Sequence, residues 1–284
     1  MKTRVQHVGL VTLPDGYRLF VEEVGDGFPL ILLHGGPGLD HTMFRPWLDP
    51  LGDEFRMLYV DGRGQGMSDR VDPTTLTFSV WANDVDLLSE ALGLERFALL
   101  GHSFGAFIAT SHATERGTAA AYILSGGGDS MAALEADDVA SFEALGDDGV
   151  AIADSFENEK TVQTEEEFAA LMETQMPLHF AGPVPPDFRA ATRYAPDVLR
   201  HVASTGYGDF DYTPTLGRVT KPTLVIVGEE DRTTTPRAAR VLHEGIRGSE
   251  LVVLPGAAHI SYVEAQDAYL DAVRAFLRRV AKPS

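Results

Sequence analysis

Ser103 lies in the motif Gly101-His102-Ser103-Phe104-Gly105, which is typical of a serine that acts as a nucleophile. The apolar run RFALL precedes the motif, and a helical pattern follows it. At a junction between a strand and a helix, two glycines permit a sharp turn that exposes the serine hydroxyl above a sheet. The start of the helix also favours developing negative charge. We therefore predict that Ser103 is a nucleophile; the alternative is an ordinary glycine-flanked helix cap.

A serine hydroxyl needs a histidine that takes its proton and a carboxylate that holds this histidine. His259 follows the apolar run LVVLPG and fits the base in the chain order serine, acid, histidine. Asp231 closes the strand-like stretch TLVIVGEED, and we favour it as the acid. Three further carboxylates near strand ends remain alternatives: Glu229, Glu230 and Asp129.

A glycine-rich stretch, HGGPG at residues 34–38, follows the apolar run PLILL. Glycines let backbone N–H groups approach a reacting oxygen closely. We predict that the amides of Gly36 and Phe104 form an oxyanion hole, the alternative being a tight turn without a catalytic role. A second glycine-rich junction, at residues 61–68, is predicted to be structural, with Arg63 bracing loops near the site by ion pairing.

These candidate residues follow short apolar runs that alternate with helical patterns on both sides of a different middle segment. Near-continuous apolar runs such as PLILLHG, RFALLGHS and PTLVIVG are typical of strands buried on both faces of a parallel sheet. The sequence therefore predicts an α/β fold with a mostly parallel, doubly wound sheet, whose ligands bind at the carboxyl ends of the strands. We expect a core of residues 1–127 and 221–284, with a helical cap, residues 128–220, inserted in it.

The chain has 284 residues and a formal net charge of −19, and its charge is unevenly distributed. Residues 128–220 hold 18 acidic and 5 basic residues, a net of −13. Such a charge repels nucleic acid and anionic membrane surfaces, so neither is expected as a partner. The same segment could attract cationic substrates, or it could be a solvated helical face.

Some classes of chemistry and location are also excluded by composition. The absence of cysteine rules out disulfides, thiolate catalysis and zinc–thiolate sites. The N-terminus lacks an apolar run of signal-peptide length, and no stretch approaches the ~18 apolar residues of a membrane span. We expect a cytoplasmic protein that acts on a small molecule or a short peptide. The sequence does not indicate an oligomeric state.

Five patterns together resemble the α/β-hydrolase fold: HGGPG, DGRGQGMS, GHSFG, the GEED strand end and PGAAHI. They are most similar to its proline iminopeptidase branch, which includes tricorn-interacting aminopeptidases and iminopeptidase-related proteins. The similarity covers about residues 15–127 and 207–279. It implies removal of an N-terminal residue, often proline, from short peptides, without a metal or a cofactor. The site residues that it implies are the triad Ser103, Asp231 and His259, with the oxyanion amides of Gly36 and Phe104.

Two positions depart from this resemblance. Tricorn-type aminopeptidases place a glutamate directly after the triad aspartate, where it helps to bind the substrate's ammonium group; here that position is Arg232. They also use a glutamate shortly before the end of the cap, where this chain reads GYGDF and offers Asp209 instead. We expect Arg232 and Asp209 at the substrate-binding site, although Arg232 would repel an ammonium group.

Three hypotheses of function follow. The first is an iminopeptidase-like aminopeptidase that uses the Ser–Asp–His triad. The second is a carboxylic-ester or lactone hydrolase with the same triad. The third is a ligand-binding member of the fold without catalytic activity, which the intact triad argues against.

Overall fold

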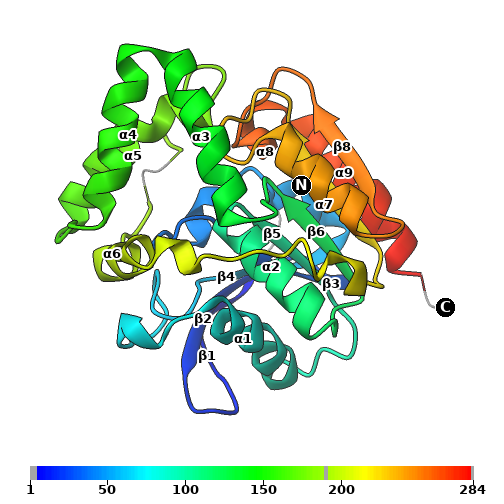
Figure 1. Ribbon diagram of the computed structural model, residues 1–284. Coiled ribbons are helices and arrows are strands. Elements are labelled where there is room, and N and C mark those ends of the chain that lie inside the picture. Colours follow the sequence, from blue (N-terminus) through cyan, green and yellow to red (C-terminus); the bar gives the residue numbers. More distant parts are fainter. Residues whose placement is uncertain (1–4, 189–190, 283–284) are drawn as a thin grey trace.

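An eight-stranded sheet lies at the centre of the chain in the computed structural model, which describes residues 5–188 and 191–282 (Figure 1). Its strand order is β1-β2-β4-β3-β5-β6-β7-β8. β1 and β2 pair antiparallel, as do β2 and β4, while every pair from β4 to β8 is parallel. The predicted α/β fold with a mostly parallel sheet is confirmed. The strands are β1 Val5–Thr12, β2 Arg18–Val24, β3 Phe28–Leu33, β4 Phe55–Val60, β5 Ala98–His102, β6 Ala121–Ser125, β7 Thr223–Gly228 and β8 Glu250–Leu254.

Helices cover both faces of the sheet, which explains why its central strands are apolar throughout. Leu99 of β5 packs in the core shared with α1, α2 and α7, whereas its neighbour Leu100 packs in the core shared with α8 and α9. This alternation is the two-residue period of a strand. The helices are α1 Phe78–Ala91, α2 Phe104–Glu115, α7 Pro236–Gly245, α8 Ser261–Glu264 and α9 Gln266–Val280.

Four further helices, which we call the inserted helices, come between β6 and β7. They are α3 Met131–Leu145, α4 Asp147–Glu159, α5 Glu165–His179 and α6 Pro196–Ser204. In Figure 1, α3, α4 and α5 stand together at one side of the sheet. α5 begins with a capping box, in which the Thr164 and Glu167 side chains each bond the other residue's backbone amide. The inserted helices fall within residues 128–220, the segment predicted to be a cap.

Short 3-10 helices occur in several connections: η1 His41–Phe44, η2 Asp49–Asp53, η3 Pro73–Thr75, η4 Gly206–Gly208 and η5 Leu216–Arg218. Within residues 5–188 and 191–282, no helix has both the length and the hydropathy needed to cross a bilayer. The parallel strands β5 to β8 are neighbours, so their carboxyl ends meet at one edge of the sheet. Ser103 follows β5, Asp231 follows β7 and His259 follows β8, which brings the three candidates to that edge.

Candidate active site

Ser103 occupies a strained turn between β5 and α2. Its φ of 55° and ψ of −121° lie outside the regions that L-residues ordinarily adopt. The turn requires both flanking glycines: a Cβ on Gly101 would lie 2.0 Å from the Gly105 carbonyl oxygen, and one on Gly105 would lie 2.1 Å from that of Leu33. The Ser103 amide donates to the carbonyl of Ser125 at 2.9 Å. The glycines of the motif therefore allow α2 to pack tightly behind Ser103, which is half-buried and lines the cavity described below.

Asp231 and His259 form a buried pair next to this turn, and each is 3% exposed. His259 Nδ1 lies 2.9 Å from Asp231 Oδ2. The Asp231 carboxylate also accepts the amides of Thr233 and Thr234, each at 2.9 Å, and the Thr234 hydroxyl at 3.1 Å. A carboxylate held in this way accepts a hydrogen bond from Nδ1–H, so the neutral ring carries its proton on Nδ1. Nε2 is then the nitrogen that can accept a proton.

The other carboxylates considered as acids lie elsewhere. Glu229 and Glu230 are exposed. Asp129 is buried but pairs with Arg237, whose Nη2 lies 3.1 Å from its Oδ1. Of the four candidates, Asp231 is the one hydrogen-bonded to His259 within the described residues.

The HGGPG loop lies directly against Ser103. Gly35, Gly36 and Ser103 line the same cavity, and a Cβ on Gly35 would lie 3.3 Å from the Ser103 Cβ. Gly36 has a φ of +129°, a conformation that side-chain-bearing residues rarely adopt. Phe104 is the first residue of α2, so its amide has no acceptor within the helix. Both predicted oxyanion amides therefore belong to segments that adjoin Ser103.

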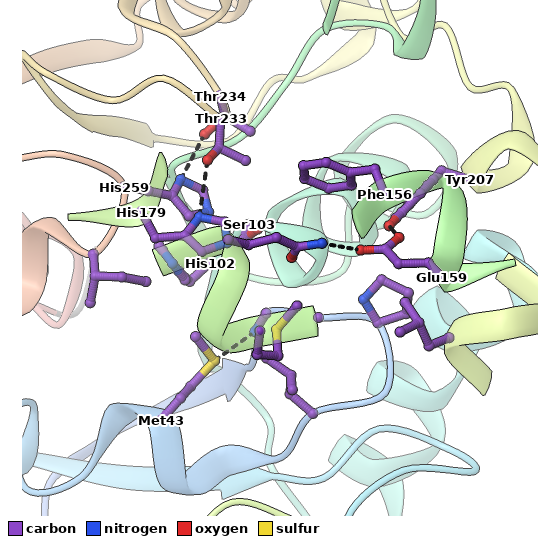
Figure 2. A pocket seen from close by; sticks show the side chains of 18 of the residues that line it. Met43, His102, Ser103, Phe156, Glu159, His179, Tyr207, Thr233, Thr234 and His259 are labelled. Atoms are coloured by element: carbon purple, nitrogen blue, oxygen red, sulfur yellow. Dashed lines mark hydrogen bonds between the residues drawn. The ribbon is translucent and has the colours of Figure 1, made fainter. Parts of the chain in front are cut away.

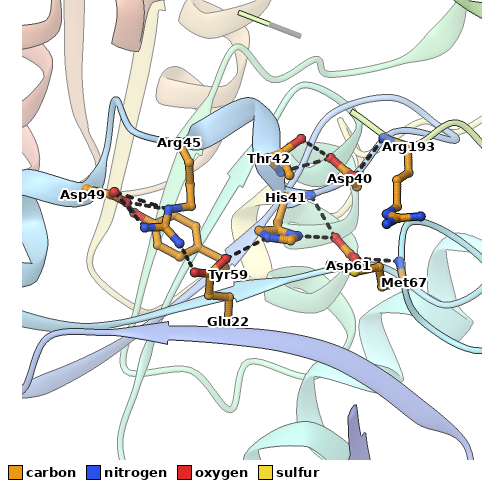
Figure 3. Close-up of polar contacts among 10 residues, drawn as sticks. All are labelled: Glu22, Asp40, His41, Thr42, Arg45, Asp49, Tyr59, Asp61, Met67 and Arg193. Atoms are coloured by element: carbon orange, nitrogen blue, oxygen red, sulfur yellow. Dashed lines mark hydrogen bonds and ion pairs between the residues drawn. The ribbon is translucent and has the colours of Figure 1, made fainter. Parts of the chain in front are cut away.

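A buried polar cluster supports the segment that follows this loop (Figure 3). His41, which is 1% exposed, places Nδ1 2.7 Å from Asp61 and Nε2 3.2 Å from Glu22. Burial alone would lower the pKa of His41, but the hydrogen bonds to Asp61 and Glu22 outweigh it and raise the pKa to about 9. The hydrogen bonds from His41 and Arg45 lower the pKa of Glu22 to about 2. A charged His41 thus joins η1 to β2 and to the loop after β4.

Arg63, predicted to brace loops near the site, forms ion pairs with Asp84 and Asp15. Its guanidinium also lies 3.9 Å from the ring centroid of Tyr17, a cation–π distance. Nearby, Gln65 accepts the amide of Gly38 at 2.6 Å and so connects this junction to the HGGPG loop. The interactions of Arg63 are those of a structural residue.

A cavity with about 1090 Å³ of empty space, its open mouth included, contains Ser103 and His259 (Figure 2). The core strands and their loops form one wall, and the inserted helices form the other. Much of the lining is apolar; it includes Met43, Phe107, Leu134, Phe156, Met172, Met176, Phe188 and Leu199. A cavity of this kind suits an apolar group held next to Ser103.

Glu159, the last residue of α4, is the most buried carboxylate of this lining and is 2% exposed. It accepts hydrogen bonds from Gln175 Nε2, at 2.8 Å, and from the Tyr207 hydroxyl. Burial raises the pKa of Glu159 to about 7, against the effect of these two hydrogen bonds. Among the described residues, no lysine, arginine or histidine forms an ion pair with Glu159. In Figure 2 Ser103 lies between the histidines on one side and the Glu159–Tyr207 pair on the other.

A second carboxyl group of the cavity belongs to Asp138 on α3. Burial and the neighbouring carboxylates of Asp137 and Glu135 raise the pKa of Asp138 to about 7. The lining therefore holds two acidic groups that ionise near neutral pH.

Tyr207 reaches Glu159 from a rare backbone turn. Residues 206–209 all have positive φ angles, 59° at Gly206, 52° at Tyr207, 81° at Gly208 and 45° at Asp209. A left-handed conformation costs roughly 1–2 kcal/mol for each residue that has a Cβ. The turn directs Tyr207 into the cavity, whereas Asp209 is exposed and is not part of the lining.

Arg232 also lies outside the cavity lining. Its carbonyl accepts the Ser141 hydroxyl at 2.9 Å, which connects α3 to the loop that carries Asp231. Arg232 and Asp209 were expected at the substrate-binding site because they stand where tricorn-type aminopeptidases place glutamates, but both lie outside the cavity lining. Glu159 and Tyr207, which were not expected there, belong to it. A signal for Glu159 was present, because it continues the i, i+4, i+7 stripe that begins with Ile152 and Phe156 on α4.

Two further histidines lie close to His259. The ring of His102 lies 4.9 Å from that of His259, and the ring of His179 lies 5.3 Å from it on another side. Burial, followed by the nearby His259, lowers the pKa of His102 well below its usual range, so His102 is neutral. His179 Nδ1 lies 3.1 Å from the Thr233 hydroxyl oxygen.

Comparison with known proteins agrees with this geometry. The family model of the alpha/beta hydrolase fold matches residues 29–266. A proline iminopeptidase of Pestalotiopsis fici is 30% identical over 273 residues, which cover 88% of this chain and 92% of that protein. Two solved structures are 28% identical. A proline iminopeptidase-related protein from Thermus thermophilus has a TM-score of 0.75 and coverage of 98% of this chain and 99% of that one. A thermophilic esterase from Thermogutta terrifontis has a TM-score of 0.71 and coverage of 98% and 100%. The resemblance to proline iminopeptidases is thereby confirmed, and the chain belongs to the alpha/beta hydrolase fold family.

Proposed function

We propose that the protein is a serine hydrolase whose triad is Ser103, His259 and Asp231. His259 Nε2 takes the Ser103 proton while the serine oxygen attacks the substrate carbonyl. The amides of Gly36 and Phe104 stabilise the resulting oxyanion, and the imidazolium gives its proton to the leaving amine or alcohol. Water, activated by His259, then hydrolyses the acyl-enzyme and restores Ser103. The strained turn at Ser103 and the 2.9 Å pair of His259 with Asp231 support these roles.

The substrate that we propose is a short peptide with a free N-terminus, from which the enzyme removes the first residue. The observation that carries this proposal is Glu159, a carboxyl group 2% exposed that two neutral donors hold inside the cavity. A buried carboxylate without a cation is costly, and an incoming ammonium group would supply the missing charge. The N-terminal residue would then lie between Glu159 and Ser103, with its side chain among the apolar residues. In this arrangement residues 128–220 form the cap of the site.

The test compares prolyl-arylamide with its N-acetyl form, which lacks the ammonium group. An ammonium–carboxylate contact in such a cavity contributes about 2–4 kcal/mol, so we expect kcat/KM to favour the free amine by roughly 30- to 1,000-fold. Glu159→Gln should abolish most of this preference with little effect on the N-acetyl substrate. Glu157→Gln is the matched control, since Glu157 lies on the same helix with its side chain 73% exposed. A parent enzyme that ignores the amine contradicts the proposal.

Hydrolysis of carboxylic esters or lactones is the second candidate. It is favoured by the apolar lining and by the position after Asp231, where an arginine replaces the glutamate of tricorn-type aminopeptidases. If this candidate holds, short acyl esters are cleaved faster than any aminoacyl-arylamide. Glu159→Gln would then leave ester hydrolysis unchanged or improve it, because the cavity would lose a buried charge.

A further inference from the structure

The residues before and after His259 are both connected by hydrogen bonds, one directly and one through Glu264, to residues 179–182. This segment lies outside the core, where α5 ends. The Ile260 amide donates to the carbonyl of His179 at 3.2 Å. On the other side, the Ala258 amide donates to Oε2 of Glu264 at 2.7 Å. The second oxygen of the same carboxylate, Oε1, accepts the amides of Ala181 and Gly182, each at 2.9 Å. Glu264 therefore bridges the loop of the base and the end of α5.

α5 also forms part of the cavity wall. Met172, Gln175, Met176 and His179 all line the cavity from this one helix. His179, its last residue, places its ring 5.3 Å from that of His259 and its Nδ1 3.1 Å from the Thr233 hydroxyl. The Thr233 amide in turn donates to Asp231. α5, which would contact the substrate along its length, therefore ends in contact with the loop that carries Asp231 and with the loop that carries His259.

We propose that Glu264 is a positioning residue that couples α5 to His259, so that the packing of α5 against the substrate sets the position of the base. The proposal rests on the proposed function, in which His259 is the general base. The carboxylate is essential to this role, because both of its oxygens face backbone N–H donors. A glutamine has one acceptor and one NH2 group, and that NH2 group would face a donor on one side of the bridge.

The first expected result is a loss of kcat in Glu264→Gln. Misplacing a catalytic group by about 1 Å can lower the rate 100-fold, so we expect kcat to fall by roughly 10- to 100-fold with KM changed less than threefold. The assay uses whichever of prolyl-arylamide and p-nitrophenyl ester the parent hydrolyses. Glu230→Gln is the matched control, because it removes an exposed carboxylate beside the Asp231 loop, and it should retain parental kcat. A folded Glu264→Gln with parental kcat overturns the proposal.

A double-mutant cycle distinguishes coupling from loss of structure. Met176→Ala, on α5, should lower kcat at least fivefold more in the parent than in Glu264→Gln, because the bridge that transmits its effect is already broken in the variant. Leu199→Ala alters a cavity residue of α6 and should lower kcat by the same factor in both backgrounds. If Glu264→Gln does not fold, Glu264→Asp, which keeps the charge but shortens the reach, replaces it in the cycle.

Equal effects of Met176→Ala in both backgrounds contradict the inference. The proposed function is tested separately, by measuring the turnover of the Ser103→Ala variant. Retained turnover in Ser103→Ala overturns the proposed function itself. An inactive Ser103→Ala combined with an additive cycle overturns the role of Glu264 alone.

Discussion

Glu159 is a carboxyl group buried among apolar side chains, and its ionisation near neutral pH follows from this position. Burial raises its pKa to about 7 because the cavity stabilises a charge less than water does. Tyr207 and Gln175 keep the carboxylate oriented without neutralising it. The ammonium binding that we propose for Glu159 therefore depends on pH in the range from 5 to 7.

This dependence predicts how the preference for free amines changes with pH. The ratio of kcat/KM for prolyl-arylamide to that for its N-acetyl form removes the contribution of His259, which serves both substrates. With a pKa of about 7 and the preference given above, ionisation of Glu159 should raise this ratio roughly 10- to 50-fold between pH 5 and pH 7. In Glu159→Gln the ratio should change much less over the same range, because Asp138 is then the remaining carboxyl group of the lining that ionises there. A ratio that is flat in the parent enzyme would exclude Glu159 as the partner of the amine.

At the scale of elements, the cluster around His41 joins η1, β2 and the loop after β4, and so supports the segment that follows the HGGPG loop (Figure 3). Because both ring nitrogens of His41 face carboxylates, the folded protein favours its protonated form. The pKa of His41 is raised in the folded state, to about 9, so its stabilising effect is complete below about pH 6.5. It is lost as the pH rises through 9.

We therefore predict a loss of stability on the alkaline side that depends on one residue. Between pH 6.5 and 9 the free energy of unfolding of the parent should fall by about 3 kcal/mol more than that of His41→Gln. Urea unfolding, followed by tryptophan fluorescence at both pH values, measures this difference. His7→Gln, which alters an exposed histidine of β1, should behave as the parent does. Parallel pH dependences of the parent and His41→Gln would show that His41 does not stabilise the fold through its charge.

Local sequence patterns were sufficient to predict where a residue lies when the connectivity of the chain fixes its position. The GHSFG motif specifies its own turn, because Gly101 and Gly105 are needed for the backbone contacts around Ser103. The apolar runs before Asp231 and His259 marked the ends of parallel strands, and the sheet then gathers those ends at one edge.

Local patterns did not predict where a residue lies when packing between elements far apart in the sequence fixes its position. The stripe of Ile152 and Phe156 places Glu159 on the inner face of α4, but the contacts with Gln175 of α5 and with Tyr207 are what enclose its carboxyl group in the cavity. Tyr207 enters the cavity because the backbone of residues 206–209 adopts positive φ angles. The conformational preferences of tyrosine do not predict such a backbone. For the same reason Asp209, two residues further on, is exposed and outside the lining.

At the scale of the whole molecule, we propose that Ser103, assisted by His259 and Asp231, is the nucleophile of a hydrolase. Reaction with a serine-selective fluorophosphonate, followed by mass spectrometry of the intact protein and of its peptides, is the decisive experiment for this role. We expect one adduct, located on Ser103, with loss of turnover in proportion to labelling. No adduct is expected in Ser103→Ala, whose turnover should fall by up to about a million-fold. An adduct on another residue, or a Ser103→Ala variant that is still active, would show that Ser103 is not the nucleophile.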